Sequence, residues 1–108
     1  DTPIVERRPA AIVLPLTEAA VAPAFALATR MRAEGLWVGV EPSGRSLKAL
    51  LRAADRQRAR VAVLIGDDEL RAGRATIRDL ERRLDRRQVL PFDAPGPDLV
   101  ASLSVDPT

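Results

Sequence analysis

One short run constrains the fold of this chain more than any other feature. Five apolar residues, Val61 to Ile65, follow Arg60 and end at Gly66. A continuous apolar run of this length is typical of a strand that is buried on both faces, as in a parallel sheet. The sequence therefore predicts an α/β domain whose central strand spans residues 60–65 and is covered by helices on both sides.

The remaining elements follow from apolar spacing and from turn residues. A helix is predicted between Thr17 and Gly35, a second from Ser46 to about Gln57, and a turn or short helical piece at residues 66–70. The last two strands are close in sequence, which favours an antiparallel pair. The other predicted elements are strands at residues 10–16, 36–40, 74–80 and 89–92 and a final short helix at residues 99–103. Together they predict a single domain with a mixed five-stranded sheet and about three helices, at residues 10–104, between a linker at 1–9 and a tail at 105–108.

The apolar positions also predict a core. Thr17 is expected to cap the first helix, and Trp37 is expected in the core rather than as a platform for base stacking. The side chains expected to face the core from the two long helices are Val21, Phe25, Leu27 and Met31 in the first, and Leu47, Leu50, Leu51 and Ala54 in the second.

Composition excludes several kinds of chemistry. The chain has no cysteine and no histidine, so thiolates and the commonest general base are absent. It has no phosphate-binding loop or nucleophile elbow, which leaves catalysis poorly supported. Asp67, Asp68 and Glu69 could bind Mg²⁺ in a small enzyme, although capping a short helical turn is the simpler interpretation. No apolar run is long enough for a membrane span, so a cytoplasmic protein is expected.

The cations of the chain suggest RNA. Sixteen of the seventeen are arginine, and Lys48 is the only lysine. The guanidinium group binds phosphates through two hydrogen bonds and stacks on bases, although a GC-rich genome also favours arginine codons. Arg45, Lys48 and Arg52 have helical spacing and could share one stripe of the second helix. Gly44 and Arg45 follow the second strand, at an edge where α/β sheets bind ligands.

The strand ends add candidate contacts to bases. Glu69 follows the third strand and can accept a hydrogen bond from a base amino or imino group. Arg78 lies on the fourth strand, with Arg74 and Thr76 on the same face by alternation. Each of these charges could also belong to an ordinary solvated surface.

Three sequence blocks occur in a characteristic order. The first is S-G-R-S-L-K at residues 43–48, the second is an apolar strand followed by G-x-x-E-L at residues 66–70, and the third is Ile77-Arg78-Asp79-Leu80. This order resembles the C-terminal anticodon-binding domain of class II aminoacyl-tRNA synthetases, and the histidyl branch most of all. The resemblance covers roughly residues 10–104.

The resemblance implies a function. It implies a domain that needs no cofactor of its own and binds a tRNA anticodon stem-loop. ATP and Mg²⁺ would serve a catalytic domain elsewhere in the parent protein, for which a homodimer is expected. The threonyl-type pattern places anticodon contacts at Arg52, Glu69 and Arg78, and a further one at Arg58. The full set of candidate tRNA-binding residues is Gly44, Arg45, Lys48, Arg52, Arg58, Glu69 and Arg78.

The chain also departs from the family pattern. Arg58 stands where glycine is common, and residues 81–88 form a longer and more basic turn than usual. These changes fit a divergent synthetase or a paralogue that has kept the fold. The alternative function is therefore an interaction or regulatory module that resembles a synthetase and has lost tRNA binding.

Overall fold

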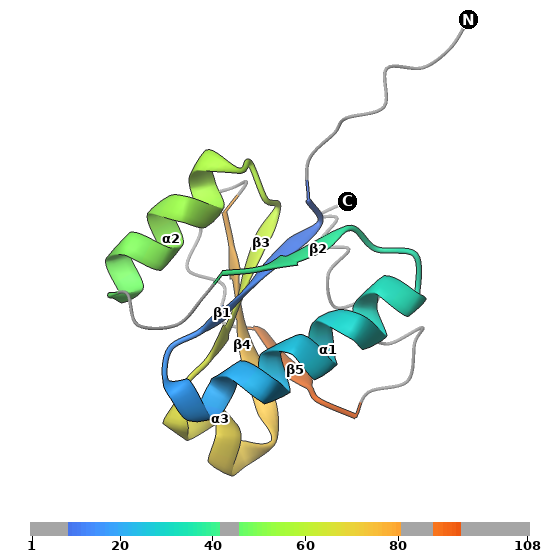
Figure 1. Cartoon of the computed structure of the whole chain (residues 1–108), viewed down its shortest axis with the longest axis vertical. Helices are drawn as coiled ribbons and strands as arrows, with labels where there is room; N and C mark the ends of the chain where they lie inside the picture. Colours follow the sequence, from blue (N-terminus) through green and yellow to red (C-terminus); the bar gives the residue numbers. More distant parts are fainter. Residues whose placement is uncertain (1–8, 42–45, 81–87, 94–108) are drawn as a thin grey trace, which may run out of the picture.

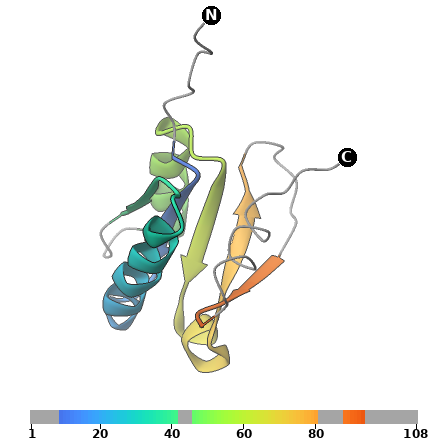
Figure 2. The same cartoon turned by 90° about the vertical axis from the view of Figure 1, so that its right-hand side faces the viewer.

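A computed structural model of the chain describes residues 9–41, 46–80 and 88–93. The predicted final helix, the tail, most of the linker, Gly44, Arg45 and all but the last residue of the basic turn lie outside the described residues. In chain order, the elements are β1 (Ala11–Pro15), the 3-10 turn η1 (Glu18–Ala20), α1 (Val21–Ala33), β2 (Val38–Val40), α2 (Leu47–Arg56), β3 (Val61–Ile65), α3 (Asp67–Ala72), β4 (Arg74–Asp79) and β5 (Gln88–Pro91). Figures 1 and 2 show their arrangement.

The sheet is mixed and has five strands, in the order β2-β1-β3-β4-β5. β1 pairs in parallel with both β2 and β3, whereas β4 is antiparallel to β3 and to β5. In Figure 2, β4 and β5 lie to the right of α1 and α2. The predicted fold class is therefore confirmed, including the antiparallel pair at the end of the chain.

Alternating side chains of the strands separate two apolar layers. Val13 and Val63 belong to the layer that contains α1, whereas Ile12, Leu14 and Leu64 belong to the layer that contains α2. All five are buried, and burying a side chain of this size contributes about 1.5–3 kcal/mol. This is why the apolar runs of β1 and β3 lack the alternation of a strand with one solvated face.

The same alternation orients β4. Ala75 and Ile77 are buried in the α1 layer, so Thr76 and Arg78 lie on the α2 side of the strand, where both are partly exposed. Gly73 leads into β4 from α3 with a φ of 71°, a left-handed conformation that glycine adopts without strain. This turn folds β4 back antiparallel to β3.

Three expectations about the core are wrong. Phe25 is 50% exposed and Trp37 is 55% exposed. The buried face of α1 is made by Ala24, Leu27, Ala28 and Met31, and Phe25 lies about 100° around the helix from Ala24. Trp37 precedes the first paired residue of β2: its carbonyl accepts from the Ala10 N–H, but its side chain stays outside. Leu47, in the first turn of α2, is 42% exposed.

The start of α1 also differs from expectation. Thr17 occupies the N-cap position of η1, but its side chain makes no capping hydrogen bond. Pro23 falls in the first turn of α1, where the helix needs no N–H from it. The 3-10 turn therefore takes up the irregular start that the proline imposes.

Candidate nucleic-acid interface

Local signals in α2 set which of its faces meets solvent. The Ser46 hydroxyl accepts from the Ala49 N–H at 3.1 Å and so caps the helix. Leu50 and Ala54, four residues apart, are buried against the sheet. A stripe beside this buried face combines three charged side chains with one leucine, at spacings of three or four residues. Its members are Lys48, Leu51, Arg52 and Asp55.

That stripe forms one wall of a groove. The opposite wall is the end of β4, which contributes Arg78, and the segment directly after it, which contributes Leu80. The groove has a volume of about 320 Å³ and opens to solvent. Leu51 and Leu80 give it an apolar part between the charged groups. It therefore combines cations and apolar surface, as a site for an unpaired nucleotide requires.

The charges of the groove are available to a ligand. Lys48, Arg52 and Asp55 come from α2, and Arg78 comes from β4. Among the residues that the structure describes, none of these four side chains has a hydrogen-bond or ion-pair partner. Counted over its described residues, the groove has three cations and one carboxylate, a net positive charge that favours a phosphate-bearing ligand.

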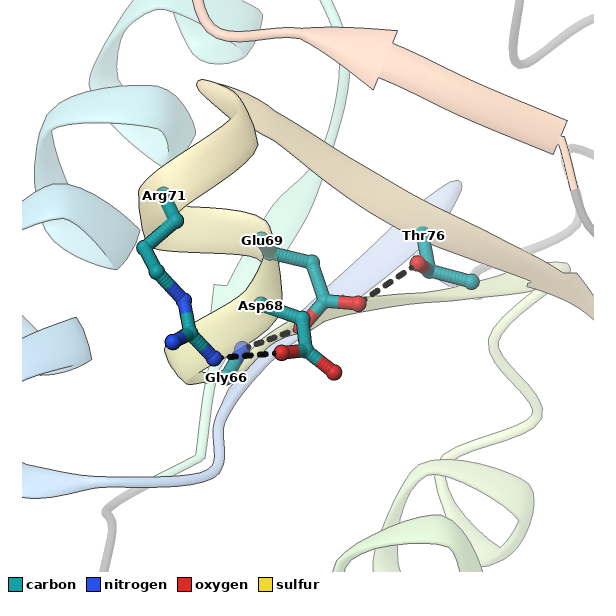
Figure 3. A network of polar contacts seen from close by, with 5 residues as sticks. All are labelled: Gly66, Asp68, Glu69, Arg71 and Thr76. Atoms are coloured by element: carbon teal, nitrogen blue, oxygen red, sulfur yellow. Dashed lines mark hydrogen bonds and ion pairs between the residues drawn. The ribbon is translucent and has the colours of Figure 1, made fainter.

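Glu69 lies on α3, beside the face of β4 that carries Thr76 and Arg78. Both of its carboxylate oxygens accept hydrogen bonds. Figure 3 shows Oε1 accepting from the Gly66 N–H at 2.7 Å and Oε2 accepting from the Thr76 hydroxyl at 2.8 Å. The first bond is the glutamate half of a capping box at the start of α3. Gly66 leaves room for it, since an added Cβ would lie 3.1 Å from Oε1. Glu69 is thus fixed to the strand that carries Arg78.

The acidic run after β3 acts locally. Asp68 pairs with Arg71 at 2.7 Å, and both side chains are largely exposed, so this pair contributes little to stability. Within residues 9–41, 46–80 and 88–93, no group of three or more acidic side chains could hold a metal ion. No helix in the same ranges is both long and apolar enough to cross a membrane.

The structure brings some of the predicted site residues together. Lys48, Arg52 and Arg78 line one groove. Glu69 joins them through Thr76, which is two residues from Arg78 on the same face of β4, a separation of about 7 Å between Cα atoms. Arg58 follows the end of α2 and does not line the groove.

Sequence reasoning missed three residues of the groove. Leu51 and Asp55 lie three and seven residues after Lys48, and that helical spacing was sufficient to include them. Leu80 had no comparable signal, because its position depends on the pairing of β4 with β3. Thr76 was placed on the correct face, but its bond to Glu69 joins two elements whose contact no local pattern reveals.

Arg58 has a strained backbone. Its φ of 61° is in the left-handed region, and it is the only non-glycine residue in the described part of the chain with positive φ. Glycine adopts this conformation without the Cβ penalty. Arginine at this position therefore costs stability.

We expect Arg58→Gly to raise the free energy of unfolding by about 0.5–1 kcal/mol, because the strain disappears. Denaturant unfolding, monitored by circular dichroism, measures this change in the free energy of unfolding. Arg52→Gly, which places glycine inside α2, is the control and should lower stability by about 1 kcal/mol. Equal destabilisation by both changes would contradict the assignment of strain to Arg58.

Comparison with known proteins gives a consistent result. A family model described as an anticodon binding domain matches residues 10–94. The chain is similar to a histidine–tRNA ligase from Desulfitobacterium hafniense, with 44% identity over 63% of this chain and 16% of the ligase. It is also similar to one from Halorhodospira halophila, with 44% identity over 79% of this chain and 20% of the ligase. The chain thus spans a fifth or less of the length of these relatives.

Solved structures share the fold. The RNA-binding domain of threonyl-tRNA synthetase from Cryptosporidium parvum Iowa II gives a TM-score of 0.76 at 23% identity, over 90% of this chain and 23% of that one. Histidyl-tRNA synthetase from Nostoc sp. PCC 7120 gives a TM-score of 0.76 at 22% identity, over 89% of this chain and 23% of that one. At these identities the likeness establishes the architecture alone.

Proposed function

We propose that this chain, which belongs to the anticodon-binding domain family, binds a tRNA anticodon stem-loop in the groove between α2 and β4. One observation carries the proposal: Lys48, Arg52 and Arg78 converge on one groove from two elements that are distant in sequence. None of the three has a partner within the described residues. Unpaired cations around an apolar floor are suited to the phosphates and splayed bases of an RNA loop.

The side chains of the groove have separate tasks. Lys48 and Arg52 attract backbone phosphates, a contact that positions RNA without reading its sequence. Leu51 and Leu80 offer apolar surface to the face of an unstacked base. Asp55 and Glu69 accept hydrogen bonds, and Arg78 donates them, so these three side chains read base edges. The described part of the groove has no aromatic side chain, so hydrogen bonds and charge supply most of its selectivity.

The parent protein is a histidine–tRNA ligase in this proposal. The support is the similarity to ligases of that name, which extends over as much as 79% of this chain. The domain would hold the anticodon end of the tRNA while a catalytic domain, which uses ATP and Mg²⁺, acts on the acceptor end. We place this parent in the cytoplasm and assign any homodimer contact to its remaining domains.

A second candidate function is an interaction module that has lost tRNA binding. The half-exposed side chains of Phe25 and Trp37 favour it, because large apolar side chains on a surface are common at protein interfaces. These two residues lie on α1 and before β2, whereas the unpartnered cations lie between α2 and β4. The two functions therefore use different surfaces and can be separated by experiment.

Binding to a panel of anticodon stem-loops at two salt concentrations tests the proposal. We expect the histidine stem-loop to bind more tightly than the others and its selectivity to survive at the higher salt. The two phosphate contacts of Lys48 and Arg52 predict a slope of log K against log salt of about −1.4, and Arg52→Ala should make it shallower by about 0.7. Similar weak binding of every RNA, abolished by salt, would instead favour the interaction module.

A further inference from the structure

The bonds of Glu69 fix which hydrogen-bonding groups this end of β4 can present. An ionised carboxylate accepts hydrogen bonds and donates none, so the proton between Oε2 and the Thr76 hydroxyl comes from Thr76. A hydroxyl has one proton. With that proton engaged by Glu69, the lone pairs of Thr76 Oγ1 remain as acceptors only. Figure 3 shows the two side chains facing one another across the gap between α3 and β4.

The pair is placed where a ligand can reach it. Glu69 and Thr76 are each partly exposed, and Thr76 lies on the α2 face of β4. Oε1 is held by the Gly66 N–H, so the carboxylate is fixed at both oxygens and cannot turn away. A fixed acceptor loses less conformational entropy on binding than a mobile one, which increases its contribution to selectivity.

From this geometry, and resting on the function proposed above, we propose that Thr76 is a positioning residue for base recognition. It orients Glu69 and, by donating its only proton to that carboxylate, makes the Glu69–Thr76 pair an acceptor-only surface. Such a surface selects an unpaired base that presents two neighbouring N–H donors. Guanine does so through N1–H and the 2-amino group, whereas cytosine, adenine and uracil place an acceptor beside each donor of that edge.

Arg78 completes the pattern. It is the next residue of β4 on the same face as Thr76, about 7 Å away along the strand. Its guanidinium donates only, and guanine carries the O6 acceptor next to N1–H. Acceptors at one position of the strand and a donor at the next therefore match the donor and acceptor order of a guanine edge.

The test pairs a base change with a protein change. The probe is the histidine stem-loop, with each anticodon guanosine replaced in turn by inosine, which lacks only the 2-amino group. For the wild-type domain, we expect the loss of a donor to a charged acceptor to weaken binding by about tenfold or more at one position. In Thr76→Val, which removes the hydroxyl and retains a strand-forming side chain, this penalty should shrink to less than about threefold.

A conservative variant separates positioning from simple structural damage. Thr76→Ser keeps the hydroxyl and should restore the inosine penalty, and circular dichroism melting shows whether either variant has lost its fold. A full penalty in Thr76→Val, or no penalty at any position in a wild-type domain that binds the stem-loop selectively, would overturn the inference alone. A wild-type domain without preference for any stem-loop would overturn the proposed function together with it.

Discussion

Replacement of Arg78 with alanine is expected to weaken binding of the histidine stem-loop by about tenfold or more, equivalent to roughly 1–3 kcal/mol. Among the described residues, Arg78 is the only arginine on the β4 wall of the groove, and none of those residues competes for its guanidinium. Arg78→Lys should recover only part of the affinity, because lysine keeps the charge but lacks the planar fork. Fluorescence anisotropy with a labelled stem-loop measures all three proteins.

A matched control separates position from charge. Arg71→Ala removes one positive charge as well, but Arg71 pairs with Asp68 and does not line the groove. We expect this change to alter affinity by less than about twofold at moderate salt, because exposed pairs contribute little. Equal losses from Arg71→Ala and Arg78→Ala would mean that only the overall charge of the domain attracts RNA.

The second large effect concerns stability. Leu50→Ala should lower the free energy of unfolding by about 2–5 kcal/mol, as measured by denaturant unfolding. Leu50 is fully buried in the layer between α2 and the sheet, where it packs with Ile12, Leu14 and Leu64. Because α2 also forms one wall of the groove, stem-loop affinity should fall with stability.

The same substitution three residues earlier is the control. Leu47 lies on α2 as well, but it is 42% exposed, so Leu47→Ala should cost less than about 1 kcal/mol. It should also leave binding unchanged. A loss at Leu47 as large as that at Leu50 would contradict the assigned phase of the helix.

The sheet could be predicted because its strands carry their signals locally. Continuous apolar runs mark β1 and β3, and Gly73 marks the turn into β4. The exposed aromatic residues could not be predicted in the same way. Phe25 and Trp37 are apolar, but their exposure depends on the rotation of α1 and on the residue at which β2 begins. Both are set by packing against the rest of the fold.

The candidate site was predictable in part for a similar reason. Helical spacing placed Lys48 and Arg52 on one stripe, and alternation placed Arg78 and Thr76 on one face. The approach of that stripe to that face is a tertiary event. The bond between Glu69 and Thr76 is another, and it changes the interpretation of Glu69 from a free acceptor to a fixed one.

Mapping of the RNA-binding surface by NMR tests the central claim most directly. The histidine stem-loop would be titrated into ¹⁵N-labelled protein while the backbone amide shifts are recorded. We predict that the largest shifts cluster on α2 and β4, near Arg52 and Arg78, and at the start of α3. Shifts concentrated on α1 and at the Trp37 indole, or spread evenly over the surface, would contradict recognition in the groove.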